Sequence, residues 1–487
     1  MKKKNALEIG GALLLAAAFS LIFYICNTPL GPVIGSDNAM YLTMGTALAD
    51  GYAPYTEIFD HKGPLLFLVQ WLPQALAGGY SMTAVFVQEV IVLFLGLLIL
   101  RAIAKELDVN VWAVQLVYLC LTGFISSGGN LSEEYANLPT LFALYLALKV
   151  FGGKEKTDRL FLPAVGMGVC AMAAFLLRAN NVLPQAALVL ILAVALAFEK
   201  DWKRLGACAG GYTLGLVLCA APIVLWLAAK GALYESFYGS ILHNFMYAET
   251  SGGSRVQMLL HSDYGYRAIL MAVLACLGAW ALYRTRHTAA LSVGMVAGAA
   301  AGGLAAFLSH KFYYHYLMVG APMAALGTAA ILTLPQKPVS KKRLGMAAAI
   351  ACACILTVMG IRENRMRQEK GEGLPEFTAN AQHLMEQVPQ EERDHFMAYR
   401  VEPKWYVAAK ALPSMRFYFL QEILAQADPA VMDEIVQTFE TNPPSYLVIF
   451  YNRSFDPPYD PRVQEIFETR YEFVDAAGQY QLLRLKQ

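Results

Sequence analysis

The chain has 487 residues, of which 57% are hydrophobic and 15% are charged, and its formal net charge at pH 7 is +1. A soluble domain is roughly half apolar and a quarter charged, so this composition excludes an ordinary soluble protein. Many apolar stretches approach or exceed the roughly 20 residues needed to cross a bilayer, and the sequence therefore predicts a polytopic membrane protein. The net charge says nothing about partners.

The N-terminus combines three lysines with an apolar run that extends to about residue 25. A signal peptide has this form. We find no convincing small-x-small cleavage site after the run, and many further apolar stretches follow, so we expect an uncleaved first membrane span.

The next segment, Gly35–Pro64, is the first long polar stretch of the chain. Ser36 is a good N-cap, and the residues from Asp37 to Ala49 are expected to form a helix. The carboxylate of Asp37 then lies at the positive end of that helix, where an anion is stabilised. Glycine and proline residues delimit a turn-rich loop that carries Asp-His-Lys at 60–62. The simplest alternative is that these charges only solvate an external loop.

The apolar residues 64–77 are too few for a span and are expected either to lie at the membrane interface or to join the next span. Ten further apolar stretches are predicted to be spans, which makes eleven with the first. Their approximate bounds are 80–102, 109–127, 134–151, 160–177, 182–198, 205–229, 266–283, 288–308, 313–334 and 344–361.

Lysine and arginine residues test this number of spans. With the N-terminus inside and the spans alternating, 18 of these residues fall inside and six fall outside, up to residue 361. The bias holds loop by loop, as the positive-inside rule requires. We therefore expect an integral plasma-membrane protein with a cytoplasmic N-terminus, an extracytoplasmic first loop at 28–64 and an extracytoplasmic C-terminus.

The tail at 364–487 is polar and follows a membrane domain at 1–363. Its apolar runs at 395–399, 446–451 and 480–485 predict strands. Helices are predicted at 402–411, 429–441 and 461–469. The fold expected from the sequence is thus a mainly α polytopic membrane domain of about eleven transmembrane helices, followed by a small extracytoplasmic α/β domain.

The eight cysteines lie in or beside apolar spans, without a disulfide framework or the spacing of a metal site. We expect no metal and no cofactor. Polar groups on the outer side are more informative. Glu133 and Glu134 begin the fourth span, where acids stabilise a helix start and Ser132 is a candidate cap. Arg178 lies at a tight outer turn, where it is expected either to reach lipid headgroups or to bind a phosphate.

The sequence SHKFYYHYLMVGAP begins at Ser309 and marks another outer interface. An aromatic belt at the membrane surface explains its tyrosines. Together with Asp37, the G-x-x-P-Y pattern ending at Tyr55 and the D-H-K-G-P sequence ending at Pro64, it resembles the C-type glycosyltransferase superfamily. The nearest branch is that of protein O-mannosyltransferases and aminoarabinose transferases, and the first outer loop is the specific part of the likeness.

This resemblance implies an enzyme that takes a sugar from a polyprenyl-phosphate-linked donor and transfers it to an extracytoplasmic acceptor, which is a lipid, a cell-envelope glycan or a protein. Membrane lipids are expected partners and nucleic acid is not. The implied catalytic residues are Asp37 with Glu133 or Glu134. The implied phosphate contacts are Lys62, Arg178 and Lys311, and the implied substrate contacts are Tyr55, Asp60, His61, Tyr314 and His315.

The expected chemistry fits these residue types. A polyprenyl phosphate is a good leaving group, so the site needs a carboxylate to accept the acceptor's proton and cations to hold the departing phosphate. One such displacement inverts the anomeric centre. The main alternative is a transporter or flippase for envelope lipids or glycans, but most of the charges lie at the ends of spans and no repeated half is visible. A non-catalytic scaffold is a third possibility.

Overall fold

The computed structural model describes residues 2–152, 160–249, 262–308, 313–334, 337–450 and 459–486. It divides into two compact units, and three of the boundaries between them fall inside helices. The first unit contains Met1–Leu30, Phe86–Leu225 and Ser251–Arg365. The second contains Gly31–Val85, Trp226–Thr250 and Met366–Gln487.

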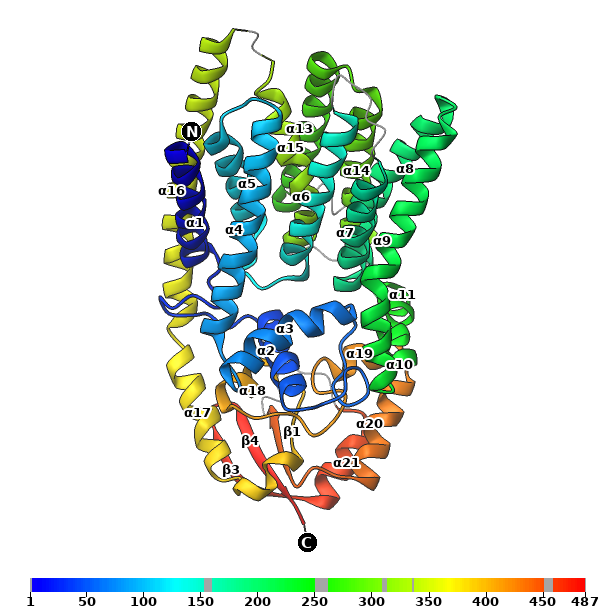
Figure 1. The fold of residues 1–487 in the computed structure, drawn as a ribbon. Helices are drawn as coiled ribbons and strands as arrows, with labels where there is room; N and C mark the ends of the chain where they lie inside the picture. The colour runs from blue at the N-terminus through cyan, green and yellow to red at the C-terminus, as the bar shows by residue number, and fades with distance from the viewer. Residues whose placement is uncertain are drawn as a thin grey trace. The chain divides into compact units, whose positions relative to one another are not determined.

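The first unit is a helical bundle (Figure 1). Its helices are α1 (Lys2–Phe23), α4 (Met82–Glu106), α5 (Val111–Ile125), α6 (Ser132–Phe151), α7 (Phe161–Leu177), α8 (Leu183–Phe198), α9 (Trp202–Ala229), α13 (Ser262–Arg286), α14 (Ala289–Leu308), α15 (Ala321–Ile331) and α16 (Pro338–Gly371), with the 3-10 segments η1 (Ala179–Val182) and η3 (Tyr314–Gly320). Helix α4, α9 and α16 each continue past a unit boundary.

Each predicted span coincides with a helical segment, and the last-but-one combines η3 with α15. Among the described residues, seven helices are long and apolar enough to cross a membrane. They contain α1, α4, α8, α9, α13, α14 and α16, and they identify an integral membrane protein. Helices α5, α7 and α15 are shorter, so the number of eleven spans stays a prediction.

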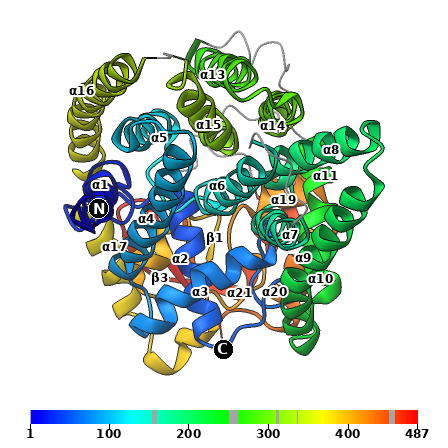
Figure 2. The same cartoon turned by 45° about the horizontal axis from the view of Figure 1, so that its top comes forward.

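Glycine allows two helices of the first unit to pack closely. Figures 1 and 2 both show α13 beside α15. A Cβ atom added to Gly278 would lie 2.0 Å from the Cα of Gly327, because the two backbones meet at this point. Small residues permit this approach within a membrane, where helices gain from close van der Waals contact.

We therefore expect Gly278→Ala to lower the free energy of unfolding by about 1–3 kcal/mol, because the added methyl group overpacks this contact. Gly303→Ala is the matched control, since no atom lies within 4 Å of a Cβ added at that helical glycine. Thermal unfolding of the purified variants in detergent compares the two. Equal effects of the two substitutions would contradict the role given to this contact.

The second unit combines helices with a four-stranded sheet (Figure 1). Its helical segments are α2 (Ser36–Ala49), α3 (Pro64–Ala77), α10 (Leu233–Phe237), the π-helix η2 (Tyr238–Leu242), α11 (His243–Glu249), α17 (Leu374–Glu386), η4 (Gln390–His395), α18 (Lys404–Ala409), α19 (Gln421–Ala427), α20 (Ala430–Thr441) and α21 (Pro461–Arg470). Helix α3 ends at Gly78, which has a φ of 73°, and so it does not join α4.

The sheet has the order β1-β2-β4-β3. Its strands are β1 (Phe396–Tyr399), β2 (Tyr446–Phe450), β3 (Tyr471–Ala477) and β4 (Tyr480–Leu485). Strand β1 pairs with β2 in parallel, and the other two pairings are antiparallel. The three predicted strands and three predicted helices of the tail are present, whereas β3, α17 and α19 were not predicted. β3 lies at an edge of the sheet and only its first residue, Tyr471, is buried, so it lacks the apolar run of a buried strand.

The first polar stretch packs against the tail within the second unit. The backbone N–H of Phe59 donates to the carbonyl of Arg416 at 3.0 Å. The hydroxyl of Tyr418 donates to the carbonyl of Met40 at 3.1 Å, and that of Tyr80 donates to the carbonyl of Ala411 at 2.8 Å. These bonds join segments more than 300 residues apart and fix the loop that carries the Asp-His-Lys sequence.

Candidate functional site

Asp37 lies in the first turn of α2 with an exposed side chain. Ser36 is the first residue of this helix rather than its cap, since Gly35 occupies the N-cap position and makes no side-chain bond. The helix therefore begins one residue earlier than predicted, and Asp37 remains in its first turn. Its exposure leaves the carboxylate accessible to an acceptor that arrives from water.

Tyr55 holds the loop that leads to Lys62. Its side chain is fully buried, and its hydroxyl donates to the carbonyl of Lys62 at 2.7 Å. Its backbone has a φ of 64°, which is uncommon for a residue with a side chain and is retained where the surroundings impose it. The ring packs on Phe67 with centroids 4.6 Å apart. Tyr55 therefore fixes the backbone of Lys62, and a role in substrate contact stays a prediction.

Asp60, His61 and Lys62 form a buried cluster. The ammonium of Lys62 is 3.0 Å from Nε2 of His61 and 3.8 Å from Oδ1 of Asp60. The backbone N–H of Lys62 also donates to Oδ1 of Asp60 at 3.1 Å. Burial raises the pKa of the Asp60 carboxyl above its ordinary value, and the charge of Lys62 acts in the opposite direction. The cluster presents a cation whose position is set by a neighbouring acid.

The start of α11, which directly follows the π-helix η2, also contacts this segment. Asn244 donates from Nδ2 to the carbonyl of His61 at 2.7 Å. His243 is buried and meets the ring of Phe59 edge-on, with centroids 5.6 Å apart. Asn244 was not among the residues predicted from the sequence. It lies just after the π-helix η2, and a π-helix often marks a functional region.

In the first unit, Glu133 is paired with Arg178. The distance from Nη1 of Arg178 to Oε1 of Glu133 is 2.5 Å, and Ser132 donates from its hydroxyl to Oε2 at 2.9 Å. Ser132 therefore does not cap α6, where Leu131 is the N-cap residue. The guanidinium of Arg178 also lies 4.2 Å from the ring centroid of Tyr316. Arg178 and Ser132 thus engage both oxygen atoms of the Glu133 carboxyl group.

The aromatic sequence at η3 contributes to the same region. His315 is buried, lies 3.3 Å from the hydroxyl of Ser127 through Nδ1, and interacts electrostatically with Glu133. The ring of Tyr314 lies beneath the guanidinium of Arg267, at 4.2 Å. Lys311 lies outside the described residues, so its role as a phosphate contact stays a prediction.

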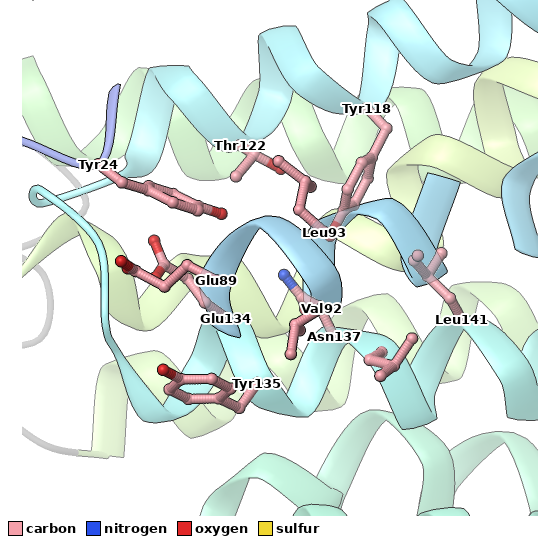
Figure 3. A pocket seen from close by; sticks show the side chains of 12 residues that line it. Tyr24, Glu89, Val92, Leu93, Tyr118, Thr122, Glu134, Tyr135, Asn137 and Leu141 are labelled. Carbon is pink, nitrogen blue, oxygen red and sulfur yellow. The ribbon is translucent and has the colours of Figure 1, made fainter. Parts of the chain in front are cut away.

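Glu134 has a different environment from its neighbour. It accepts the backbone N–H of Leu131 at 3.2 Å and so satisfies the helix start, as the simpler interpretation of these two acids anticipated. Its carboxyl lies in a cavity with Glu89, a buried residue of α4 that the sequence analysis did not identify (Figure 3). A single acid inside an otherwise apolar span was the signal for Glu89.

The predicted site residues therefore fall into two sets. Tyr55, Asp60, His61 and Lys62 join Asp37 in the second unit, whereas Glu133, Glu134, Arg178, Tyr314 and His315 belong to the first. The expected action of Asp37 with Glu133 or Glu134 stays a prediction. Within the described ranges, no group of three or more His, Cys, Asp or Glu side chains is placed to hold a metal ion.

Known structures resemble this chain over most of its length. The aminoarabinose transferase ArnT from Cupriavidus metallidurans, bound to undecaprenyl phosphate, is 14% identical, with a TM-score of 0.61 over 97% of this chain and 98% of ArnT. The archaeal oligosaccharyltransferase AglB from Archaeoglobus fulgidus, in complex with an inhibitory peptide and a dolichol-phosphate, is 12% identical, with a TM-score of 0.51 over 91% and 69% of the two chains. No family model and no curated protein matches the sequence.

Both structures have the fold of C-type glycosyltransferases, so the comparison confirms the resemblance at the level of the fold. It does so at identities where a likeness establishes the fold alone and leaves the activity to the residues of the site.

Proposed function

We propose that this chain transfers a sugar from a polyprenyl-phosphate-linked donor to an extracytoplasmic acceptor by an inverting displacement. The proposal rests on one observation above the others, which is a C-type glycosyltransferase fold over 97% of the chain. The outer-loop residues supply the chemistry, since an exposed carboxylate and a positioned cation occur in one unit.

In the proposed reaction, Asp37 is the base. Its carboxylate accepts the proton of the acceptor group as that group bonds to the anomeric carbon. The bond from this carbon to the phosphate breaks, and the polyprenyl phosphate leaves with the electron pair. Lys62 holds that phosphate with a charge-assisted hydrogen bond. No group has to protonate the leaving phosphate, because it is stable as an anion.

The other site residues have supporting roles in this proposal. We assign the second carboxylate to Glu133, because Glu134 is engaged at the helix start and in the cavity with Glu89. Arg178 and Lys311 are further candidates for phosphate binding, although Arg178 is bound to Glu133 in this structure. Asp60 and His61 are proposed to orient Lys62 toward the donor, and Tyr314 and His315 to contact the sugar or carrier.

The proposal places the first loop and the tail outside the membrane. A reporter fused after Gln487 should therefore be extracytoplasmic, and one fused after Lys342 should be cytoplasmic, because the lysines and arginines of the predicted inside loops remain inside. Alkaline phosphatase and fluorescent-protein fusions measure the two positions. The same side for both reporters would contradict eleven spans.

The function is tested with purified protein and a panel of polyprenyl-phosphate sugars that differ in the sugar. Release of the carrier phosphate with hydrolysis or transfer of one of these sugars supports the proposal. Folded protein that leaves the donors intact but, once reconstituted, moves them between bilayer leaflets would instead identify a transporter or flippase. The acceptor is then sought among lipids, envelope glycans and proteins, using the donor that is cleaved.

A further inference from the structure

Residues 233–244 of the second unit contain α10, η2 and the first two residues of α11 (Figure 1). The π-helix η2 approaches the loop that carries the Asp-His-Lys sequence through Gly239. A Cβ atom added to Gly239 would lie 3.0 Å from Cδ1 of Tyr55 and 3.2 Å from the carbonyl oxygen of Asp60. Because both distances are shorter than a side chain normally makes, the absence of a Cβ atom lets the backbone of η2 come close to the loop.

Asn244 joins this segment to the loop through its side-chain amide. Nδ2 donates to the carbonyl of His61 at 2.7 Å and to the carbonyl of Ser240 at 2.9 Å. Carbonyl oxygens only accept hydrogen bonds, so the amide nitrogen rather than Oδ1 has to face them. The two carbonyls thus give each hydrogen of the amide a partner, and the bond to His61 links positions 183 residues apart.

The backbone around Lys62 is held by three hydrogen bonds. Its N–H donates to Oδ1 of Asp60 at 3.1 Å, and its carbonyl accepts the hydroxyl of Tyr55 at 2.7 Å. The bond from Asn244 fixes the peptide group between His61 and Lys62, because a peptide group is planar and its carbonyl and N–H turn together. Of these three bonds, the one from Asn244 comes from outside the loop.

This restraint matters for the ammonium of Lys62, which lies 3.0 Å from Nε2 of His61. His61 and Lys62 are only 8% and 7% exposed. A rotation of the peptide group between them would change the directions of both side chains. A charged group that is fixed before its ligand arrives loses less conformational entropy on binding, so the position of this peptide group affects the affinity for a phosphate.

We infer that Asn244 is a positioning residue for Lys62, which it orients toward the carrier phosphate by holding the peptide group before it. The inference rests on the proposed function, because it takes Lys62 as the phosphate contact. Asn244 does not touch the donor in this account and has no part in the proton transfer assigned to Asp37. Its loss should therefore weaken binding of the carrier and leave the maximal rate of transfer unchanged.

Full-length protein in detergent is titrated with undecaprenyl phosphate, the carrier alone, at a temperature well below the Tm of every variant. Asn244→Leu keeps the approximate volume of the side chain and removes both hydrogen bonds, so it should weaken binding by about three- to tenfold. Asn244→Gln retains an amide on a longer arm and should recover part of that affinity. Single-turnover transfer at saturating donor should proceed at the wild-type rate in both variants.

Tyr238→Phe is the matched control. Tyr238 lies in the same segment, and its hydroxyl donates to the carboxylate of Asp428 instead of to the loop. Phenylalanine keeps the ring and removes this bond, so the variant should be less stable but should bind undecaprenyl phosphate like the wild type. An equal loss of affinity in Tyr238→Phe and Asn244→Leu would overturn the inference, because any loosening of the segment would then weaken binding.

A double-mutant cycle with Lys62→Ala separates this inference from the proposed function. In the Lys62→Ala background, Asn244→Leu should cause no further loss of affinity, since the group that Asn244 positions is absent. Additive losses would mean that Asn244 acts through another group and would overturn the inference. If Lys62→Ala weakens binding but Asn244→Leu does not, only this inference fails. If Lys62→Ala itself binds the carrier normally, the assignment of Lys62 fails and the inference fails with it.

Discussion

Asp37→Asn should reduce the rate of sugar transfer by about 10²–10⁴, because the amide preserves the shape of the side chain but does not accept the proton of the acceptor. Donor binding should survive, since the carboxylate is not expected to hold the carrier phosphate. Single-turnover transfer with preformed donor complex measures the rate, and equilibrium titration measures donor affinity. The helix N-terminus should accept the neutral amide with little loss of stability.

Asp50→Asn is the matched control, because Asp50 is an exposed acid at the other end of the same helix. It should transfer sugar at the wild-type rate. Near-normal transfer by Asp37→Asn would refute the assignment of the base and leave Glu133 or Glu134 for that role.

Lys62→Ala should weaken donor binding by roughly 10- to 100-fold, because it removes a charge-assisted hydrogen bond to the carrier phosphate. The folded protein should also be less stable, since Asp60 is fully buried and loses the adjacent cation. Titration with a non-hydrolysable polyprenyl-phosphate sugar measures the affinity. Lys62→Arg keeps the charge and separates the loss of charge from the change in shape.

Lys230→Ala is the control for the second prediction. Lys230 is an exposed residue of the same unit, and its ammonium lies 3.4 Å from the carbonyl of Gly51. It should bind the donor normally. If Lys62→Ala also binds the donor normally, Arg178 or Lys311 would be assigned as the phosphate contact instead.

The sequence was sufficient for the helices of the predicted spans and for α2 in the first loop. Apolar runs long enough to cross a bilayer can be recognised in the sequence alone. Each of the predicted runs coincides with a helical segment. The helix that begins at Ser36 was predictable because its signals are local, namely a polar start and a following helical run. The tail strands β1, β2 and β4 were predictable for the same reason, since each is a short apolar run between turn residues.

The environments of the site residues depend on contacts that are remote in sequence. Glu133 and Arg178 are 45 residues apart, and only the fold shows that the arginine binds this acid instead of standing free for a phosphate. The positive φ of Tyr55 and its bond to the Lys62 carbonyl are likewise tertiary effects. Glu89 was a single acid within an apolar span, which is a local signal, but its environment depends on Asn27 and Asn130, which come from two other segments.

The central claim is that Asp37 acts in the chemical step and Lys62 in donor binding, and one measurement on the wild type and both variants tests it most directly. Single-turnover sugar transfer is followed over a range of donor concentrations. The account predicts that Asp37→Asn lowers the maximal rate and leaves the half-saturating donor concentration unchanged, whereas Lys62→Ala raises that concentration. An identical change of both quantities in the two variants would contradict the account, because it would indicate a shared loss of folding instead of two separate roles.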